Sequence, residues 1–183
     1  MATPLLLQAE HVAKAYAGVP ALRDGRLSLR AGSVHALCGG NGAGKSTFLS
    51  ILMGITQRDA GSILLNGAPV QFNRPSEALA AGIAMITQEL EPIPYMTVAE
   101  NIWLGREPRR AGCIVDSKAL NRRTRELLES LEFDVDATSP MHRLSVAQMQ
   151  LVEIAKALSR GCQVMIMDEP TSAIGEREAE TLF

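Results

Sequence analysis

The stretch GGNGAGKST, Gly39 to Thr47, decides the fold. It fits the pattern G-x-x-x-x-G-K-[ST], with Gly39, Gly44, Lys45 and Ser46 at the fixed positions, and it follows an apolar run at 34–38 that we expect to be a strand. Glycines let a backbone wrap closely around phosphate oxygens, and the helix that follows points its positive end at the same place. A Gly-rich strand-to-helix turn without a ligand stays the alternative at this point.

The loop has a defined chemistry if it holds phosphate. Lys45 would reach the β- and γ-phosphates of a nucleoside triphosphate, and the hydroxyl of Ser46 would ligate magnesium. The predicted phosphate-binding residues are Gly39, Gly40, Asn41, Gly42, Ala43, Gly44, Lys45, Ser46 and Thr47.

Length and composition narrow the class of protein. A chain of 183 residues with 46% apolar residues corresponds to one domain with ample core material, and a net charge of −2 argues against general nucleic-acid binding. The first ten residues carry no basic segment, and no apolar run approaches the roughly 20 residues that span a bilayer. We therefore expect neither export nor insertion of the chain on its own, and membrane association only through a partner.

The cysteines and histidines show no ligand spacing. The set is Cys38, Cys113, Cys162, His11, His35 and His142, and no two of them are spaced as a metal or redox motif. An odd number of isolated cysteines suits a reducing cytosol. We assign structural or solvated roles to all six.

The first half of the chain alternates strand and helix signals. Short apolar patterns between turn residues predict strands over 5–16, 21–29, 62–65 and 83–87, and helices over 48–54 and 75–81. The helix after the loop is apolar on almost every side, so it should be buried. The strand over 83–87 delivers Gln88 at its end.

The second half is mainly helical until its last strand. Helices are predicted over 97–105 and 117–131, with a loop at 108–113 between them. Ser145 and Gln148 form the capping-box pattern, so a further helix begins there and continues to about Leu158. Val164 to Met167 predict a buried strand that ends in Asp168-Glu169.

Three features admit a structural and a functional interpretation on these residues. Tyr16 is either an aromatic packed on a sheet or a ring that stacks on adenine. The segment LSVAQMQ, 144–150, is either a well-capped helix or a second anion site. Asp168 and Glu169 fit a surface turn, but ligands of parallel sheets lie at the carboxyl ends of strands, which favours a nucleotide site shared with Lys45.

The order and spacing of these motifs resemble the nucleotide-binding domain of ABC transporters. The resemblance rests on Tyr16, GGNGAGKST, Gln88, LSVAQMQ and VMIMDEPTSA, and the phrases EALAAGIAMITQEL and MTVAENIWLGREP are similar to the ATP-binding subunit of bacterial monosaccharide importers of the ribose, xylose and galactose type. It covers essentially the whole chain. It implies an α/β P-loop NTPase fold of the ABC type, with a mainly parallel core, an antiparallel β-subdomain and a helical subdomain at about 92–159 within one domain, 1–183.

The resemblance also implies a role for each site residue. Tyr16 would stack on the adenine of ATP, Gln88 would sense Mg²⁺ and couple to the membrane subunit, Asp168 would be the magnesium-linked aspartate and Glu169 the general base. The residues that would close over ATP held by a second ATP-binding domain are Ser145, Val146, Ala147 and Gln148, so that two domains sandwich two nucleotides. Lys45, Gln88 and Glu169 are thus the implied catalytic set, and Ser46, Gln88 and Asp168 the implied metal set. Trp103 lies either near the contact with the membrane subunit or in the core.

The implied partners define the setting. They are the second ATP-binding domain, the membrane permease subunits and, indirectly, a periplasmic sugar-binding protein, with no nucleic acid. The location would be peripheral, on the cytoplasmic side of the bacterial inner membrane, and the chain alone would be soluble. ATP hydrolysis would drive monosaccharide uptake.

Three departures from the family pattern bear on activity. Ala147 stands where glycine is usual, Ile174-Gly175 stand where Leu followed by Asp or Thr is usual, and the chain ends at Phe183 before the family's switch histidine. We therefore expect ATP binding with poor hydrolysis by these 183 residues. The alternatives are a regulatory module that holds nucleotide without turnover, and a non-transport ABC-type ATPase, which should show a basic face or a long coiled-coil insertion.

Overall fold

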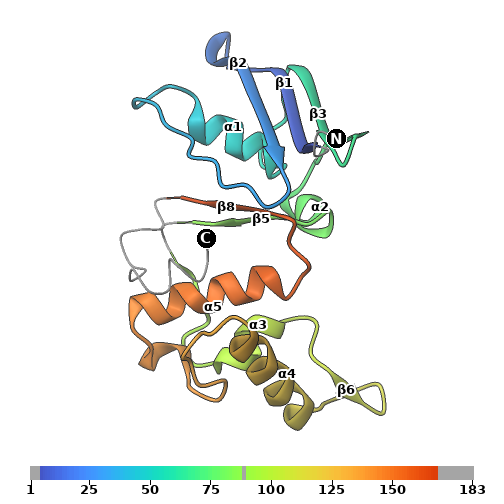
Figure 1. The fold of residues 1–183 in the computed structure, drawn as a ribbon, viewed down its shortest axis with the longest axis vertical. Helices are drawn as coiled ribbons and strands as arrows, with labels where there is room; N and C mark the ends of the chain where they lie inside the picture. Colours follow the sequence, from blue (N-terminus) through green and yellow to red (C-terminus); the bar gives the residue numbers. More distant parts are fainter. Residues whose placement is uncertain (1–4, 88–89, 169–183) are drawn as a thin grey trace. The chain divides into compact units, whose positions relative to one another are not determined.

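The computed structural model describes residues 5–87 and 90–168, and the chain divides into two compact units, 1–84 and 85–183. The first unit is built on an antiparallel sheet with the order β2-β1-β3-β4 (Figure 1). Its strands are β1 (Leu5–Tyr16), β2 (Val19–Arg30), β3 (Ala60–Leu65) and β4 (Ala68–Pro69). The predicted antiparallel subdomain is thereby confirmed.

The turns of this sheet follow from local sequence. Ala17 and Gly18 join β1 to β2 with φ values of 47° and 82°, and Asn66 and Gly67 join β3 to β4 with φ values of 52° and 76°. Two successive residues with positive φ twist the chain in the same sense as the flanking strands, which is why two-residue hairpins use them.

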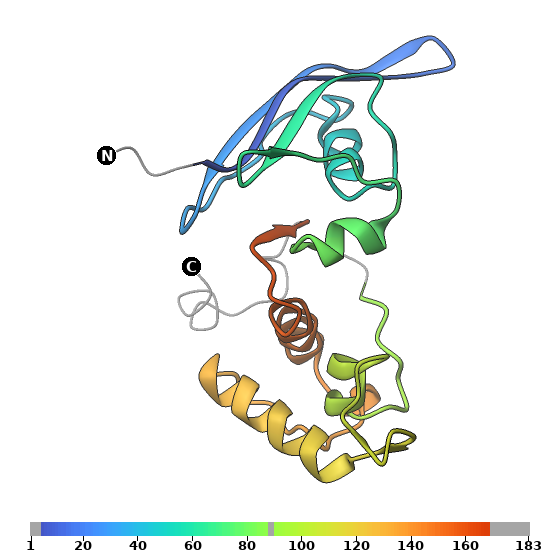
Figure 2. The same cartoon turned by 90° about the vertical axis from the view of Figure 1, so that its right-hand side faces the viewer.

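Helix α1 (Lys45–Leu52) covers one face of the sheet (Figure 2). Phe48, Ile51 and Leu52 are buried, which confirms the predicted buried helix. A Cβ on Gly25 of β2 would lie 2.9 Å from the Phe48 ring, so the sheet can approach this helix closely only because residue 25 is glycine. Helix α2 (Pro75–Ala80) begins at the proline, as predicted.

The strand expected over 34–38 is wrong for the described structure. These residues form neither helix nor strand, and Val34 and Leu37 are 70% and 45% exposed. A strand needs a ladder of backbone hydrogen bonds, and the sheet of the first unit ends at β2 and β4 without including this segment. Apolar composition alone does not provide a neighbouring strand.

Three helices form the core of the second unit: α3 (Val98–Trp103), α4 (Ser117–Ser130) and α5 (Val146–Leu158). Helix α3 packs against both α4 and α5. Val98, Ile102, Leu128, Val152 and Ile154 are among the buried residues of this core. A 3₁₀ turn (Met141–Arg143) precedes α5. The predicted loop at 108–113 contains part of a small hairpin, β6 (Arg109–Arg110) with β7 (Ile114–Val115).

All three of these helices begin at a side-chain cap. Thr97 and Ser145 form complete capping boxes with Glu100 and Gln148, and Asp116 accepts a hydrogen bond from the Ala119 N–H. The helix start predicted at Ser145 is therefore confirmed. The box at Thr97 has the same S/T-x-x-E/Q signature in the sequence.

Two short strands, β5 (Ile83–Ile86) and β8 (Val164–Met167), pair with each other. The boundary between the units falls within β5, and the Asp168 N–H donates to the Ile86 carbonyl oxygen at 3.1 Å just beyond β8. These two strands occupy the sequence positions at which strands of the mainly parallel core are expected. The fold is of the α/β class, as predicted, whereas the proposed subdomain limits of 92–159 stay a prediction.

No helix of the described residues is long and apolar enough to cross a membrane.

Candidate nucleotide-binding site

The predicted phosphate loop reverses direction at two glycines and then enters α1. Gly42 and Gly44 have φ values of 79° and 91°, and the Ala43 N–H donates to the Gly40 carbonyl oxygen at 3.2 Å. A Cβ on Gly44 would lie 2.7 Å from the Ala21 carbonyl oxygen, whereas one on Gly40 would meet nothing within 4 Å. Glycine is required at position 44 by both backbone conformation and space.

The ammonium group of Lys45 curls back over this loop. Its Nζ donates to the carbonyl oxygens of Gly39 and Gly40 at 2.5 Å and 3.0 Å. These carbonyl groups hold the positive charge above the glycine backbone. A triphosphate could replace them with its own oxygens, which form stronger, charge-assisted hydrogen bonds.

Like α2, and unlike α3, α4 and α5, helix α1 begins without a side-chain cap. Its N-cap residue is Gly44, and no side chain accepts a hydrogen bond from its first turn. The first N–H groups of a helix lack partners within the helix, so they are available to an anion here. In α3, α4 and α5 a side chain fills the corresponding position.

The predicted magnesium ligands are oxygen atoms on the surface. Ser46, in the first turn of α1, and Asp168, directly after β8, are both exposed. A hydroxyl and a carboxylate suit Mg²⁺, which prefers oxygen ligands and retains several waters. The donor types therefore fit the ion. The two residues lie in different units, so their approach stays a prediction.

Tyr16 lies at the end of β1 and is 48% exposed. Its ring is contacted by the Lys14 ammonium, 5.6 Å from the ring centroid, and its hydroxyl lies 3.4 Å from the Thr56 hydroxyl. The Tyr16 side chain is therefore accessible, and its stacking role stays a prediction. An accessible aromatic ring is able to stack on a base.

The N-terminus of α5 is closed by its own cap. The Ser145 Oγ accepts from the Gln148 N–H at 3.2 Å, and the Gln148 Oε1 accepts from the Ser145 N–H at 3.1 Å. Val146 and Ala147 lie next in the helix, and Val146 is exposed. This geometry matches a well-capped helix, while the contact with a second domain stays a prediction.

Some of the remaining predicted site residues lie outside the described part of the structure. Gln88, Glu169 and Ile174-Gly175 lie outside the described residues. Trp103 is half-buried, its Nε1 donates to the Thr124 hydroxyl at 3.0 Å, and the Arg106 guanidinium lies 5.1 Å from its ring. These contacts within the helical core support the core interpretation of Trp103.

The histidines and cysteines form no metal site in the described part of the chain, where no group of three or more His, Cys, Asp or Glu side chains is arranged to hold an ion. His35 contacts the Ser33 hydroxyl, and His142 contacts the Pro94 carbonyl oxygen and the Tyr95 ring. Both histidines thus contact groups of their own chain.

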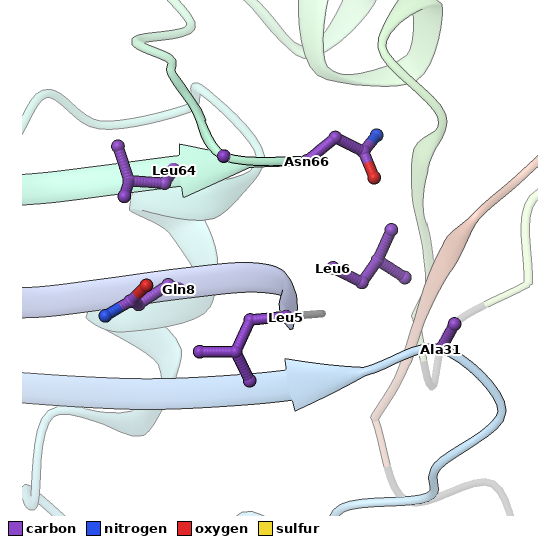
Figure 3. Close-up of a pocket in the computed structure, with 7 residues that line it drawn as sticks. Leu5, Leu6, Gln8, Ala31, Leu64 and Asn66 are labelled. Carbon is purple, nitrogen blue, oxygen red and sulfur yellow. The ribbon is translucent and has the colours of Figure 1, made fainter. Parts of the chain in front are cut away.

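A pocket of about 540 Å³ opens elsewhere in the first unit (Figure 3). Its lining residues are Leu5, Leu6, Gln8, Ala31, Leu64, Asn66 and Gly67. None of them is a predicted nucleotide-binding residue, and the set includes no charged side chain to neutralise phosphate. The pocket is therefore distinct from the predicted nucleotide site at residues 39–47.

An α/β fold with a G-x-x-x-x-G-K-[ST] loop at the start of a helix defines a P-loop NTPase domain. Comparison with known proteins narrows this class. The sequence model described as "ABC transporter" matches residues 22–172. The chain belongs to the ABC transporter family.

Curated relatives support the same assignment. The chain is 53% identical over 180 residues to a putative ribose/galactose/methyl galactoside import ATP-binding protein of Pseudomonas syringae pv. syringae, covering 98% of this chain and 34% of the relative. It is 51% identical to a ribose import ATP-binding protein of Rhodopirellula baltica, covering 98% of this chain and 35% of the relative. The chain thus spans about a third of the length of these relatives.

Solved structures share the fold. An ATP-binding cassette of an ABC transporter in its ADP conformation matches with a TM-score of 0.81 and 26% identity, covering 98% of this chain and 74% of that one. A subunit of an ABC transporter complex from Clostridium perfringens matches with a TM-score of 0.76 and 25% identity, covering 97% and 70%.

Proposed function

We propose that the chain binds Mg-ATP and acts as the ATP-binding part of a bacterial monosaccharide importer. The observation that carries this proposal is the phosphate loop, where Lys45 lies over the glycine backbone and α1 begins without a side-chain cap. The names of the relatives, which are import ATP-binding proteins for ribose and galactose, favour a sugar as the transported substrate.

Hydrolysis would use residues on both sides of the triphosphate. Lys45 would neutralise the β- and γ-phosphates, while Ser46 and Asp168 would hold Mg²⁺, which spreads the charge that develops on phosphate oxygens. Glu169 would accept a proton from the attacking water, and Gln88 would sense the metal and report to the membrane subunit. Tyr16 would stack on adenine.

The partners follow from this role. A second ATP-binding domain would close on the nucleotide through Ser145, Val146, Ala147 and Gln148, and membrane permease subunits would receive the motion. A periplasmic sugar-binding protein would act indirectly, and the assembly would lie on the cytoplasmic face of the inner membrane. Slow ATP hydrolysis by the 183-residue chain stays a prediction, which the rate of phosphate release would measure.

The test is a calorimetric titration of ATP, with and without Mg²⁺, on wild type and on Lys45→Ala. Losing a charged hydrogen-bond donor should weaken ATP binding about 10-fold to 100-fold. Lys118→Ala, which removes an exposed lysine from α4, is the matched control and should bind as wild type does. Equal affinities for wild type and Lys45→Ala would contradict the proposal.

A further inference from the structure

Asp59 contacts the last residues of β1 at three points. Its N–H donates to the Ala13 carbonyl oxygen at 2.9 Å, its Oδ1 accepts from the Lys14 ammonium at 2.7 Å, and its Oδ2 accepts from the Ala15 N–H at 2.7 Å. These residues directly precede Tyr16. The Asp59 carboxylate, located just before β3, thereby binds both a backbone N–H and the Lys14 ammonium at the end of β1.

The strand needs such a support because its ladders are irregular here. The register with β2 shifts between Val12 and Lys14 and again between Lys14 and Ala15, and the register with β3 shifts before Ala13. Shifts of this kind leave backbone groups outside the regular ladder. Ala15 lies beyond the last residue pair between β1 and β3, Ala13 with Ala60, and the Asp59 carboxylate accepts its N–H.

The same carboxylate balances the charge of Lys14. The Lys14 side chain is 16% exposed and Asp59 is 48% exposed, so the cation is the more enclosed member of the pair. The hydrogen bond from Lys14, followed by that from the Ala15 N–H, lowers the pKa of Asp59 below its ordinary value. Asp59 is therefore ionised at neutral pH.

Two neighbouring residues, Lys14 and Thr56, contact the Tyr16 side chain. The Lys14 ammonium lies over the ring, 5.6 Å from its centroid, and Thr56, three residues before Asp59, approaches the ring hydroxyl. A cation over one face leaves the opposite face for a planar partner. Lys14, paired with Asp59, thus contacts the ring, and Thr56 contacts its hydroxyl.

We propose that Asp59 and Lys14 are positioning residues that orient the Tyr16 ring to stack on the base of a bound nucleotide. This inference rests on the proposed function, because it requires a triphosphate at residues 39–47. It assigns recognition of the base to a unit made of Asp59, Lys14 and Tyr16, separate from the phosphate loop.

The test compares two ligands on the full chain: Mg-ATP, which has a base, and magnesium tripolyphosphate, which has none. Tyr16→Ala should weaken ATP binding roughly 5-fold or more, as expected for the loss of one stacked base. Asp59→Asn, which keeps the shape and removes the charge, should weaken ATP binding about 2-fold to 5-fold, a smaller loss than that of Tyr16→Ala because the ring is still present. Neither substitution should change tripolyphosphate binding.

A double-mutant cycle separates positioning from general stability. In the Tyr16→Ala background, Asp59→Asn should have no further effect on ATP, because the ring that it orients is absent. Asp24→Asn is the matched control: it removes an exposed carboxylate of β2 that pairs with Arg26, and ATP affinity should stay unchanged. If Asp59→Asn does not fold, Lys14→Met decides the outcome by the same comparison of ligands.

The inference and the proposed function fail differently. Insensitivity of both ligands to Lys45→Ala would overturn the nucleotide site itself. If Lys45→Ala weakens both ligands as expected, the inference is overturned when Asp59→Asn leaves ATP affinity unchanged, weakens tripolyphosphate equally, or adds fully to Tyr16→Ala. Selective, non-additive loss of ATP binding supports it.

Discussion

Gly44 is the more constrained of the two fixed glycines of the phosphate loop, Gly39 and Gly44. It is the N-cap of α1 in the left-handed region, with φ of 91°, and β2 approaches it so closely that a Cβ would contact the Ala21 carbonyl oxygen. Gly40, four residues earlier, has a negative-φ backbone and open space around it. The backbone conformation of the loop therefore requires glycine at position 44 but not at position 40.

This difference predicts a difference in stability between two substitutions. Gly44→Ala should lower the free energy of unfolding by about 2 kcal/mol or more, since it adds a left-handed alanine and a steric contact with backbone. Gly40→Ala, the matched control, should lie within about 0.5 kcal/mol of wild type. Urea unfolding monitored by circular dichroism measures both. Equal stability of the two variants would show that β2 does not constrain Gly44.

At the scale of elements, Asp116 joins a hairpin to a helix. Its carboxylate accepts hydrogen bonds from the Arg110 guanidinium of β6 at 2.6 Å and 2.9 Å, and from the Ala119 N–H of α4 at 3.1 Å. The Arg110 guanidinium first, and the helix N–H second, lower the pKa of Asp116 from 3.8 to about 2. One carboxylate thereby links β6 of the hairpin to the first turn of α4.

A depressed pKa gives a defined dependence on pH. The contribution of Asp116 is present above pH 3.8, its ordinary pKa, and is lost as the pH falls toward its lowered pKa of about 2. Carboxyl NMR should show Asp116 titrating near pH 2 in wild type, and at a higher pH in Arg110→Gln. Arg122→Gln, which removes an exposed arginine paired with Glu126, should leave the midpoint in place. Titration of wild-type Asp116 at pH 3.8 would rule out the link.

Local sequence patterns predicted most helices and strands, but they did not predict which strands pair or which distant side chains meet. The capping pattern at Ser145 and the turn at Asn66-Gly67 act within four residues, so the sequence shows them directly. The segment 34–38 is as apolar as a strand, yet the pattern does not show whether a neighbouring strand exists. The contact between Asp59 and Lys14 joins residues 45 positions apart, and no local signal identifies it.

At the scale of the whole molecule, the predicted site draws on both units. The phosphate loop and Tyr16 belong to residues 1–84, whereas Asp168 and the capped α5 belong to residues 85–183. The sequence predicted the residue types of the metal site because each lies at the end of a recognisable strand or at the start of a helix. That Ser46 and Asp168 hold one ion stays a prediction, because they lie 122 positions apart and no local pattern encodes their approach.

Shared coordination of one Mg²⁺ would make Ser46 and Asp168 act as a unit. The measured quantity is the ratio of the ATP dissociation constants without and with Mg²⁺. Ser46→Ala and Asp168→Asn should each lower this ratio roughly tenfold, since each removes a metal contact. The double variant should lower it little further, because residues that hold one ion are not independent. Asp134→Asn, an exposed acid of the same unit as Asp168, should leave the ratio unchanged. Fully additive losses would instead show that the two residues do not meet at one ion, and the two units would then not form a common magnesium site.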